Sequence, residues 1–286
     1  MTSGYRTKPR VADAGGDPIV QMSRPGRWPS IDAPRFVALA RHSDPPFRDE
    51  RVLGLAFARH PRMFPIGLLD TYEVVNGSEE GTSYVVARCA LTDLTAAFDR
   101  QISGRTLTFE NSGALWRDML VLRDRETGSY WTPSTGEAIA GPMAGSRLTP
   151  IPAPVTTADS WEQLQPSTVC LETGDLTAVP LRLRLYAASP WQGVSGERTD
   201  LGPFKPKDPV FFVREGDEAL AFTAEEIRRR GRVESGLGGR AIVVEWDAGL
   251  RAPRAWEPVA AARREIPVVP IYWFALKRHF RTVRTL

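Results

Sequence analysis

Proline and glycine interrupt this chain at short intervals along its whole length. The sequence contains 24 residues of each type among its 286 residues. Proline removes a backbone donor and breaks helices, and glycine favours turns, so long helices are disfavoured. Short strands joined by turns are what such a chain can form. We therefore predict an α+β fold that is β-rich, with mostly antiparallel short strands.

Local patterns place some of these elements. Short runs of β-forming residues predict strands over residues 51–58, 83–89, 106–110 and 119–123. Three short helices are predicted over residues 65–72, 158–165 and 223–230. The third is the clearest, because Thr223 can cap its start and Gly231 can end it. Its glutamates lie in the first turn and its arginines in the last, as the helix dipole favours.

Two segments of the chain resemble each other. Residues 52–98 align with residues 210–256 without a gap, with seven identities and matching apolar positions. Each copy is typical of a strand, a short helix, a glycine turn and a further strand. We predict pseudo-duplicated halves, about 50–172 and 207–286, within one compact domain over residues 31–286. The alternative is that two short α+β segments share a pattern without common origin.

The first half is the more elaborate of the two. It contains a long middle segment, residues 103–155, that the second half lacks. A functional pocket is therefore expected in the first half. Residues 1–30 are rich in Gly, Pro, Arg and Asp and have little periodicity, so they predict a flexible or loosely docked N-terminal arm, which Trp28 could anchor to the body.

The sequence also indicates the compartment. Residues 1–20 contain no apolar stretch typical of a secretory signal. The longest uncharged apolar run, residues 266–276, contains two prolines and is too short to span a bilayer. Only Cys89 and Cys170 occur, which excludes a disulfide framework. We expect a soluble, cytoplasmic protein with reduced thiols and no contact with a membrane.

The charges are nearly balanced. Thirty-seven Lys and Arg residues face 34 Asp and Glu residues, which gives a net charge of +3. Proteins that bind nucleic acid concentrate a larger surplus on one face, so nucleic acid is not an expected partner. Basic residues cluster over 228–232 and 277–284. They are typical of a helix end and a solvated chain end, or else of a surface that contacts an acidic protein.

Few motifs for chemistry are present. The sequence has no Gly-rich phosphate loop, no metal-binding cysteine pair and no Gly-x-Ser-x-Gly nucleophile motif. Polar residues are densest over residues 109–145, in turns between predicted strands, where binding sites are often formed. The candidate ligand-binding residues there are Asn111, Ser112, Asp124, Glu126 and Trp131. The alternative is a hairpin turn, in which Asp124 accepts backbone N–H groups.

Several segments resemble a known family in the same order along the chain. They are Leu69–Asn76, Thr95–Arg100, Leu107–Gly113, Asp124–Trp131, Gly136–Pro142, Trp161–Leu171 and Tyr272–Ala275. Together they resemble the bacterial and archaeal Domain of Unknown Function 3179 family, over roughly residues 50–286. The resemblance implies no activity, because the function of that family is unknown.

One family motif is altered in this chain. Family members commonly have Cys-Pro-x-Cys where this chain has Cys89-Ala90-Leu91-Thr92. A thiol pair at that place could bind a soft metal or cycle between redox states, but one thiol cannot form the pair. Cys89 is retained as a candidate metal ligand or nucleophile. A small, buried apolar side chain is the alternative.

Two hypotheses for function follow. The first is a protein that binds a small molecule or a metal ion, extending to a pathway enzyme, with its pocket near Cys89 and residues 109–145. A metal ion is the candidate cofactor. The second is a non-enzymatic protein-interaction module that uses the arginine-rich surfaces. The sequence is compatible with an enzyme and with a binding protein, and it indicates no particular oligomeric state.

Overall fold

The computed structural model describes residues 8–39, 48–172, 181–198, 202–259 and 262–286. Five short helices lie in these residues, and the strands form six sheets. Every pairing between the described strands is antiparallel except β5–β17 and β19–β25. The predicted fold class, a β-rich α+β protein with mostly antiparallel strands, is confirmed.

The first half consists of two small sheets and two short helices. Its elements in chain order are β4 (Arg51–Leu55), β5 (Arg62–Pro65), α2 (Ile66–Tyr72), β6 (Val74–Glu79), β7 (Thr82–Cys89), β8 (Leu94–Asp99), β15 (Thr149–Ile151), β16 (Val155–Thr157), α3 (Ala158–Leu164) and β17 (Val169–Glu172). One sheet has the order β16-β4-β5-β17-β3, where β3 is Arg35–Ala38, and the other has the order β15-β8-β7-β6.

The second half repeats this order of elements. They are β18 (Pro209–Glu215), β19 (Glu218–Phe222), α5 (Ala224–Arg230), β20 (Arg232–Leu237), β21 (Arg240–Asp247), β22 (Ala252–Val259), β23 (Ala262–Ile266), β24 (Val269–Tyr272), α6 (Trp273–His279) and β25 (Thr282–Thr285). The sheets β24-β18-β19-β25 and β23-β22-β21-β20 have the same neighbours as their counterparts.

The correspondence extends to strand direction and register. The two parallel pairs, β5–β17 and β19–β25, occur at equivalent places in the two halves. Gly54 faces Met63 across β4–β5, and Phe212 faces Ala221 across β18–β19, which matches the alignment of the two segments. This agreement supports the proposal that the halves are related.

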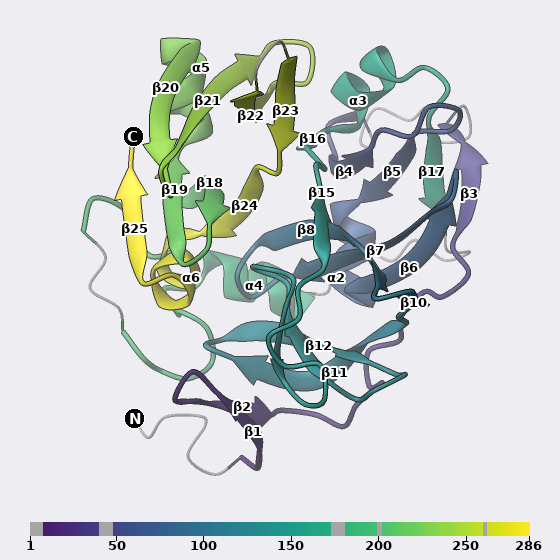
Figure 1. The fold of residues 1–286 in the computed structure, drawn as a ribbon, viewed down its shortest axis with the longest axis vertical. Helices are drawn as coiled ribbons and strands as arrows, with labels where there is room; N and C mark the ends of the chain where they lie inside the picture. The colour runs from purple at the N-terminus through teal and green to yellow at the C-terminus, as the bar shows by residue number, and fades with distance from the viewer. Residues whose placement is uncertain (1–7, 40–47, 173–180, 199–201, 260–261) are drawn as a thin grey trace.

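The extra segment of the first half is shorter than the predicted residues 103–155, because β15 and β16 have counterparts in β23 and β24 of the second half. The segment builds a third layer. It contains β9 (Gln101–Ile102), β10 (Arg105–Thr106), β11 (Phe109–Trp116), β12 (Met119–Asp124), β13 (Tyr130–Thr132) and β14 (Glu137–Ala140). Together with β1 (Arg10–Ala14) and β2 (Asp17–Gln21), four of these form the sheet β1-β2-β11-β12-β13-β14. In Figure 1 this sheet lies across one end of the molecule, below the two halves.

The described part of the N-terminal segment, residues 8–30, is docked on the body. Hairpin β1–β2 joins the six-stranded sheet through the pairing of β2 with β11. Ile19 and Val20 are fully buried there. The ring of Trp28 contacts the guanidinium of Arg182 at 4.2 Å. Residues 8–30 are docked because they gain ladder hydrogen bonds and buried apolar area, whereas residues 1–7 lie outside the described residues.

The three predicted helices are present, with Thr157 and Thr223 as side-chain caps of α3 and α5. Two helices were not predicted, namely α4 (Leu181–Ala188) and α6. Helix α6 follows the prolines of an apolar run and buries residues around most of its circumference, so its sequence lacks the helical period. None of the helices in the described part of the chain has the length and apolarity that crossing a membrane requires.

Candidate functional site

The carboxylates predicted as ligand-binding groups lie in and beside one hairpin turn. The buried carboxylate of Asp124 accepts the N–H groups of Thr127 at 2.6 Å and Ser129 at 3.1 Å. It also accepts the indole N–H of Trp131 at 2.8 Å. Glu126 is exposed and accepts the N–H of Thr108 at 2.7 Å. These bonds close the turn between β12 and β13.

Asn111 and Ser112 are buried in β11, where the pairing with β12 is irregular. The amide of Asn111 donates to the carboxylate of Glu73, and its oxygen accepts the N–H of Gly113 at 2.7 Å. The hydroxyl of Ser112 donates to the carbonyl of Val121 at 2.5 Å. Both side chains are therefore occupied in holding the strand.

Cys89 ends β7 in the largest core cluster. Its thiol is buried, and its sulfur accepts the N–H of Leu120 at 3.3 Å. Burial raises the pKa of the Cys89 thiol, so the neutral form persists at neutral pH. Among the described residues no group of three or more His, Cys, Asp and Glu side chains is placed to hold a metal ion. Cys89 as a metal ligand stays a prediction.

A network of buried charges lies beside Cys89. Arg88 forms ion pairs with Asp70 at 2.8 Å and with Asp93 at 2.7 Å, and Asp93 also pairs with Arg51 at 3.1 Å. Arg88 and Asp70 line a cavity of about 330 Å³ beneath α4 and Tyr272. The buried charges of Arg88 and Asp70 at this cavity pair with each other, whereas Arg184 of α4, which also lines it, is exposed and forms no ion pair with the described residues.

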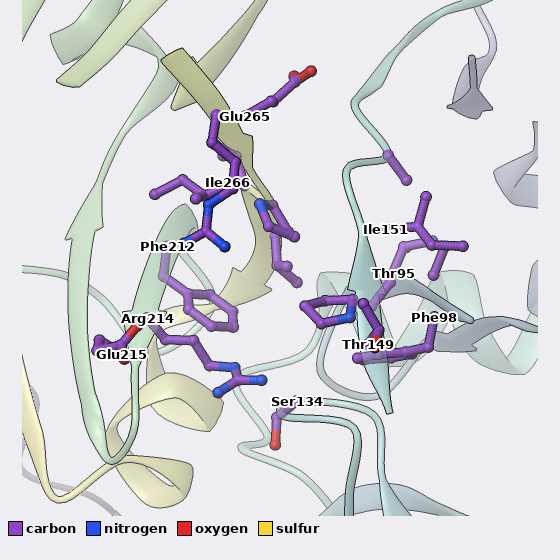
Figure 2. A pocket seen from close by; sticks show the side chains of 18 of the residues that line it. Thr95, Phe98, Ser134, Thr149, Ile151, Phe212, Arg214, Glu215, Glu265 and Ile266 are labelled. Atoms are coloured by element: carbon purple, nitrogen blue, oxygen red, sulfur yellow. The ribbon is translucent and has the colours of Figure 1, made fainter. Parts of the chain in front are cut away.

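A second cavity lies where the two halves meet, and we call it the junction pocket. Its volume is about 400 Å³. The first half contributes β8, β15 and Ala153, the second half contributes β18, β23 and β24, and the extra segment contributes Ser134. Figure 2 shows Phe212 and Arg214 on one wall and Phe98 and Ile151 on the other.

The walls of the junction pocket combine apolar residues with hydroxyl and charged ones. Their apolar residues include Ala96, Phe98, Pro150, Ile151, Ala153, Phe212, Ile266, Pro267, Val268 and Val269. Three hydroxyl side chains, those of Thr95, Ser134 and Thr149, also line it. A cavity in which apolar walls meet polar groups that can orient a ligand is compatible with a small-molecule site.

Arg214 is the distinctive polar group of this pocket. It projects from β18 into the space between the walls (Figure 2) and donates to the carbonyl of Thr135 at 2.5 Å. Burial, and then the nearby Arg147 guanidinium, lower the pKa of Arg214 below its ordinary value. An arginine nevertheless stays protonated at neutral pH. Among the residues that the structure describes, no carboxylate forms an ion pair with Arg214.

The other charges of the pocket are paired. Arg240 lies 3.4 Å from Glu215 and 3.7 Å from Glu257, and Arg264 also pairs with Glu257. Glu265 is held by Arg254, outside the pocket, at 2.7 Å. Arg214 therefore has no ion-pair partner among the described residues, although the carboxylates of Glu215 and Glu137 act on its charge from a longer distance.

None of the predicted site residues lines the junction pocket. The sequence nevertheless contains a partial signal for it, since the likeness of the two halves predicts an interface between them, and pockets favour such interfaces. Arg214 also stands between Val213 and Glu215 in a β-forming run, where an arginine is not needed for the strand. No sequence pattern reports that it lacks a carboxylate partner.

The arginine cluster at the end of α5 is partly neutralised. Arg230 pairs with Glu226 at 3.0 Å, and Arg232 pairs with Glu234 at 2.9 Å and with Glu245 at 3.6 Å. An interaction surface built on these arginines stays a prediction.

The fold and the pocket define a β-rich protein of two similarly built halves with a cavity of ligand size between them. The chain belongs to the family described as "Protein of unknown function (DUF3179)", whose model matches residues 25–279. The resemblance found in the sequence is confirmed. Comparisons with curated proteins and with solved structures gave no match.

Proposed function

We propose that this protein binds a small organic molecule in the junction pocket. The observation that carries the proposal is a cavity of about 400 Å³ between the two halves, with both apolar and polar lining residues and an arginine, Arg214, that has no ion-pair partner among the described residues. Ligand pockets commonly have volumes of 300–1,000 Å³, so this one suits a small metabolite. The sequence also predicts binding of a small molecule, but it predicts the site near Cys89 and residues 109–145, whereas the site proposed here is the junction pocket. Only Ser134 of that segment lines it.

The setting we propose is the cytoplasm. Both cysteines are buried free thiols, which is typical of proteins from a reducing compartment.

The test is to fill the pocket from its rim. Thr149 lies on β15 at the pocket and is exposed, so Thr149→Trp adds a large ring there without disturbing the core. Binding of octanoate and octan-1-ol is measured by ligand-observed NMR. The wild-type protein should bind at least one of the two probes, and Thr149→Trp should abolish that binding.

The matched control is Thr282→Trp, on the exposed strand β25 outside the pocket. It should bind like the wild type. Native mass spectrometry of untagged protein adds an independent readout, because a retained small molecule should be missing from the Thr149→Trp variant. No binding of either probe to the wild type, or binding that Thr149→Trp leaves unchanged, contradicts the proposal.

A further inference from the structure

We propose that the junction pocket takes a monocarboxylate with a short apolar body, and that the carboxylate pairs with Arg214. This inference rests on the proposed function and names the class of ligand.

The charge balance of the pocket sets the charge of the ligand. The guanidinium groups of Arg240 and Arg264 are matched by the carboxylates of Glu215 and Glu257. Arg214 has no ion-pair partner among the described residues, and the carboxylates of Glu215 and Glu137 act on it only from a longer distance. A partly buried cation without a partner costs free energy, and an anionic ligand group relieves that cost.

The guanidinium of Arg214 has donors to spare. An arginine carries five N–H donors, and the described contacts use one of them, on the carbonyl of Thr135. This single bond fixes the direction of the side chain. The remaining donors form the planar fork that matches the two oxygens of a carboxylate.

A single negative charge fits better than two. Glu215 also lines the pocket, and its carboxylate would repel a second negative charge on the ligand. A phosphate monoester carries close to two charges at neutral pH, whereas a carboxylate carries one. The pocket therefore favours a monocarboxylate over a phosphate ester.

The rest of the ligand must be apolar. Phe98 and Ile151 face Phe212 and Ile266 across the pocket (Figure 2). Each methylene placed between these walls is removed from water, which favours an aliphatic or aryl body. The volume of about 400 Å³ restricts that body to a short chain or one ring.

The experiment compares three probes with the same body and different head groups, namely octanoate, octan-1-ol and octylamine, at pH 7. Dissociation constants are measured for the wild type and for Arg214→Gln and Arg214→Lys. Octanoate should bind the wild type at least about tenfold more tightly than octan-1-ol, as expected for a charge-assisted hydrogen bond. Octylamine should bind more weakly than octan-1-ol.

The variants separate charge from fold. Arg214→Gln should weaken the binding of octanoate by about 10- to 100-fold and leave the binding of octan-1-ol nearly unchanged. Arg214→Lys should restore part of the lost affinity for octanoate. The unchanged binding of octan-1-ol shows that the variant pocket is intact. Arg281→Gln, a change of an exposed arginine outside the pocket, should bind all three probes like the wild type.

Two other outcomes have distinct meanings. If octan-1-ol binds as tightly as octanoate, or Arg214→Gln leaves octanoate binding unchanged, the carboxylate inference is overturned while the pocket still binds ligands. If no probe binds the wild type, the proposed function and this inference both fail.

Discussion

At the residue scale, Glu73 has the most unusual surroundings of the acidic side chains. It follows α2 with a left-handed backbone, φ 61°, and its carboxylate accepts the side-chain amide of Asn111. Burial raises the pKa of Glu73 to about 7, because the charged form is poorly hydrated there. Asp70 adds to the rise, while Asn111 and Arg88 oppose it. The folded protein therefore holds a proton on Glu73 at a pH where an exposed glutamate has lost it.

This environment predicts a pH dependence of stability. Between about pH 4.5 and pH 7 the folded state binds more protons at Glu73 than the unfolded chain does, so the free energy of unfolding falls as pH rises. Glu73→Gln removes this dependence and can still accept the Asn111 amide. Relative to the wild type, the free energy of unfolding of the variant should increase by about 1–3 kcal/mol as the pH rises from 5 to 8, as measured by urea unfolding. If the free energies of unfolding of the wild type and of Glu73→Gln change with pH in the same way, the prediction is wrong.

Glu73 and Arg214 also show what the sequence leaves undetermined. The environment of Glu73 comes from residues such as Asn111 and Arg88, and that of Arg214 from an interface between two halves. Single-chain patterns report local period and capping, which is why α5 and its cap Thr223 could be predicted. They do not report burial or missing partners, which depend on tertiary contacts. Asp124 could be predicted as a turn residue because its partners lie within seven positions.

At the element scale, the halves solve the same packing problem with different residues. In the first half Gly54 of β4 lies under the ring of Trp161 from α3. At the equivalent places the second half has Phe212 in β18 and Leu276 in α6. The first half thus combines a glycine in the strand with a tryptophan in the helix, whereas the second half combines a phenylalanine in the strand with a leucine in the helix. The exchange puts a phenylalanine on the wall of the junction pocket.

Gly54 should therefore be intolerant of a side chain. A Cβ at this position would lie 2.4 Å from ring carbons of Trp161, which is buried and fixed by its bond to Thr168. Gly54→Ala should lower the free energy of unfolding by about 1–3 kcal/mol through overpacking. Gly236 in β20 is the matched control, since its nearest new contact is 3.8 Å away. Gly236→Ala should stay within about 0.5 kcal/mol of the wild type in the same denaturant titration. If Gly54→Ala and Gly236→Ala lower the free energy of unfolding by the same amount, the overpacking explanation is wrong.

At the scale of the whole molecule, one buried carboxylate joins three distant segments. Asp118, in the turn between β11 and β12, accepts the N–H groups of Val194 and Ser195, each at 2.8 Å. It also forms an ion pair with Arg278 of α6. Its side chain is 0% exposed, and that of Arg278 is 6% exposed. Asp118 therefore connects the sheet of the extra segment to helix α6 of the second half, and both of these parts lie close to the junction pocket.

Removing the cation from this pair should loosen the assembly. Arg278→Met removes the guanidinium that pairs with the fully buried carboxylate of Asp118, and it should cost about 3–5 kcal/mol of unfolding free energy. Amide hydrogen exchange should rise at the β11–β12 turn and at residues 194–195, because both are held through Asp118. Arg281→Met is the control, because Arg281 is 88% exposed and lies 3.8 Å from its carboxylate partner. Such a surface pair contributes about 0–1 kcal/mol, so a loss in Arg278→Met no larger than in Arg281→Met would show that the halves are held together elsewhere.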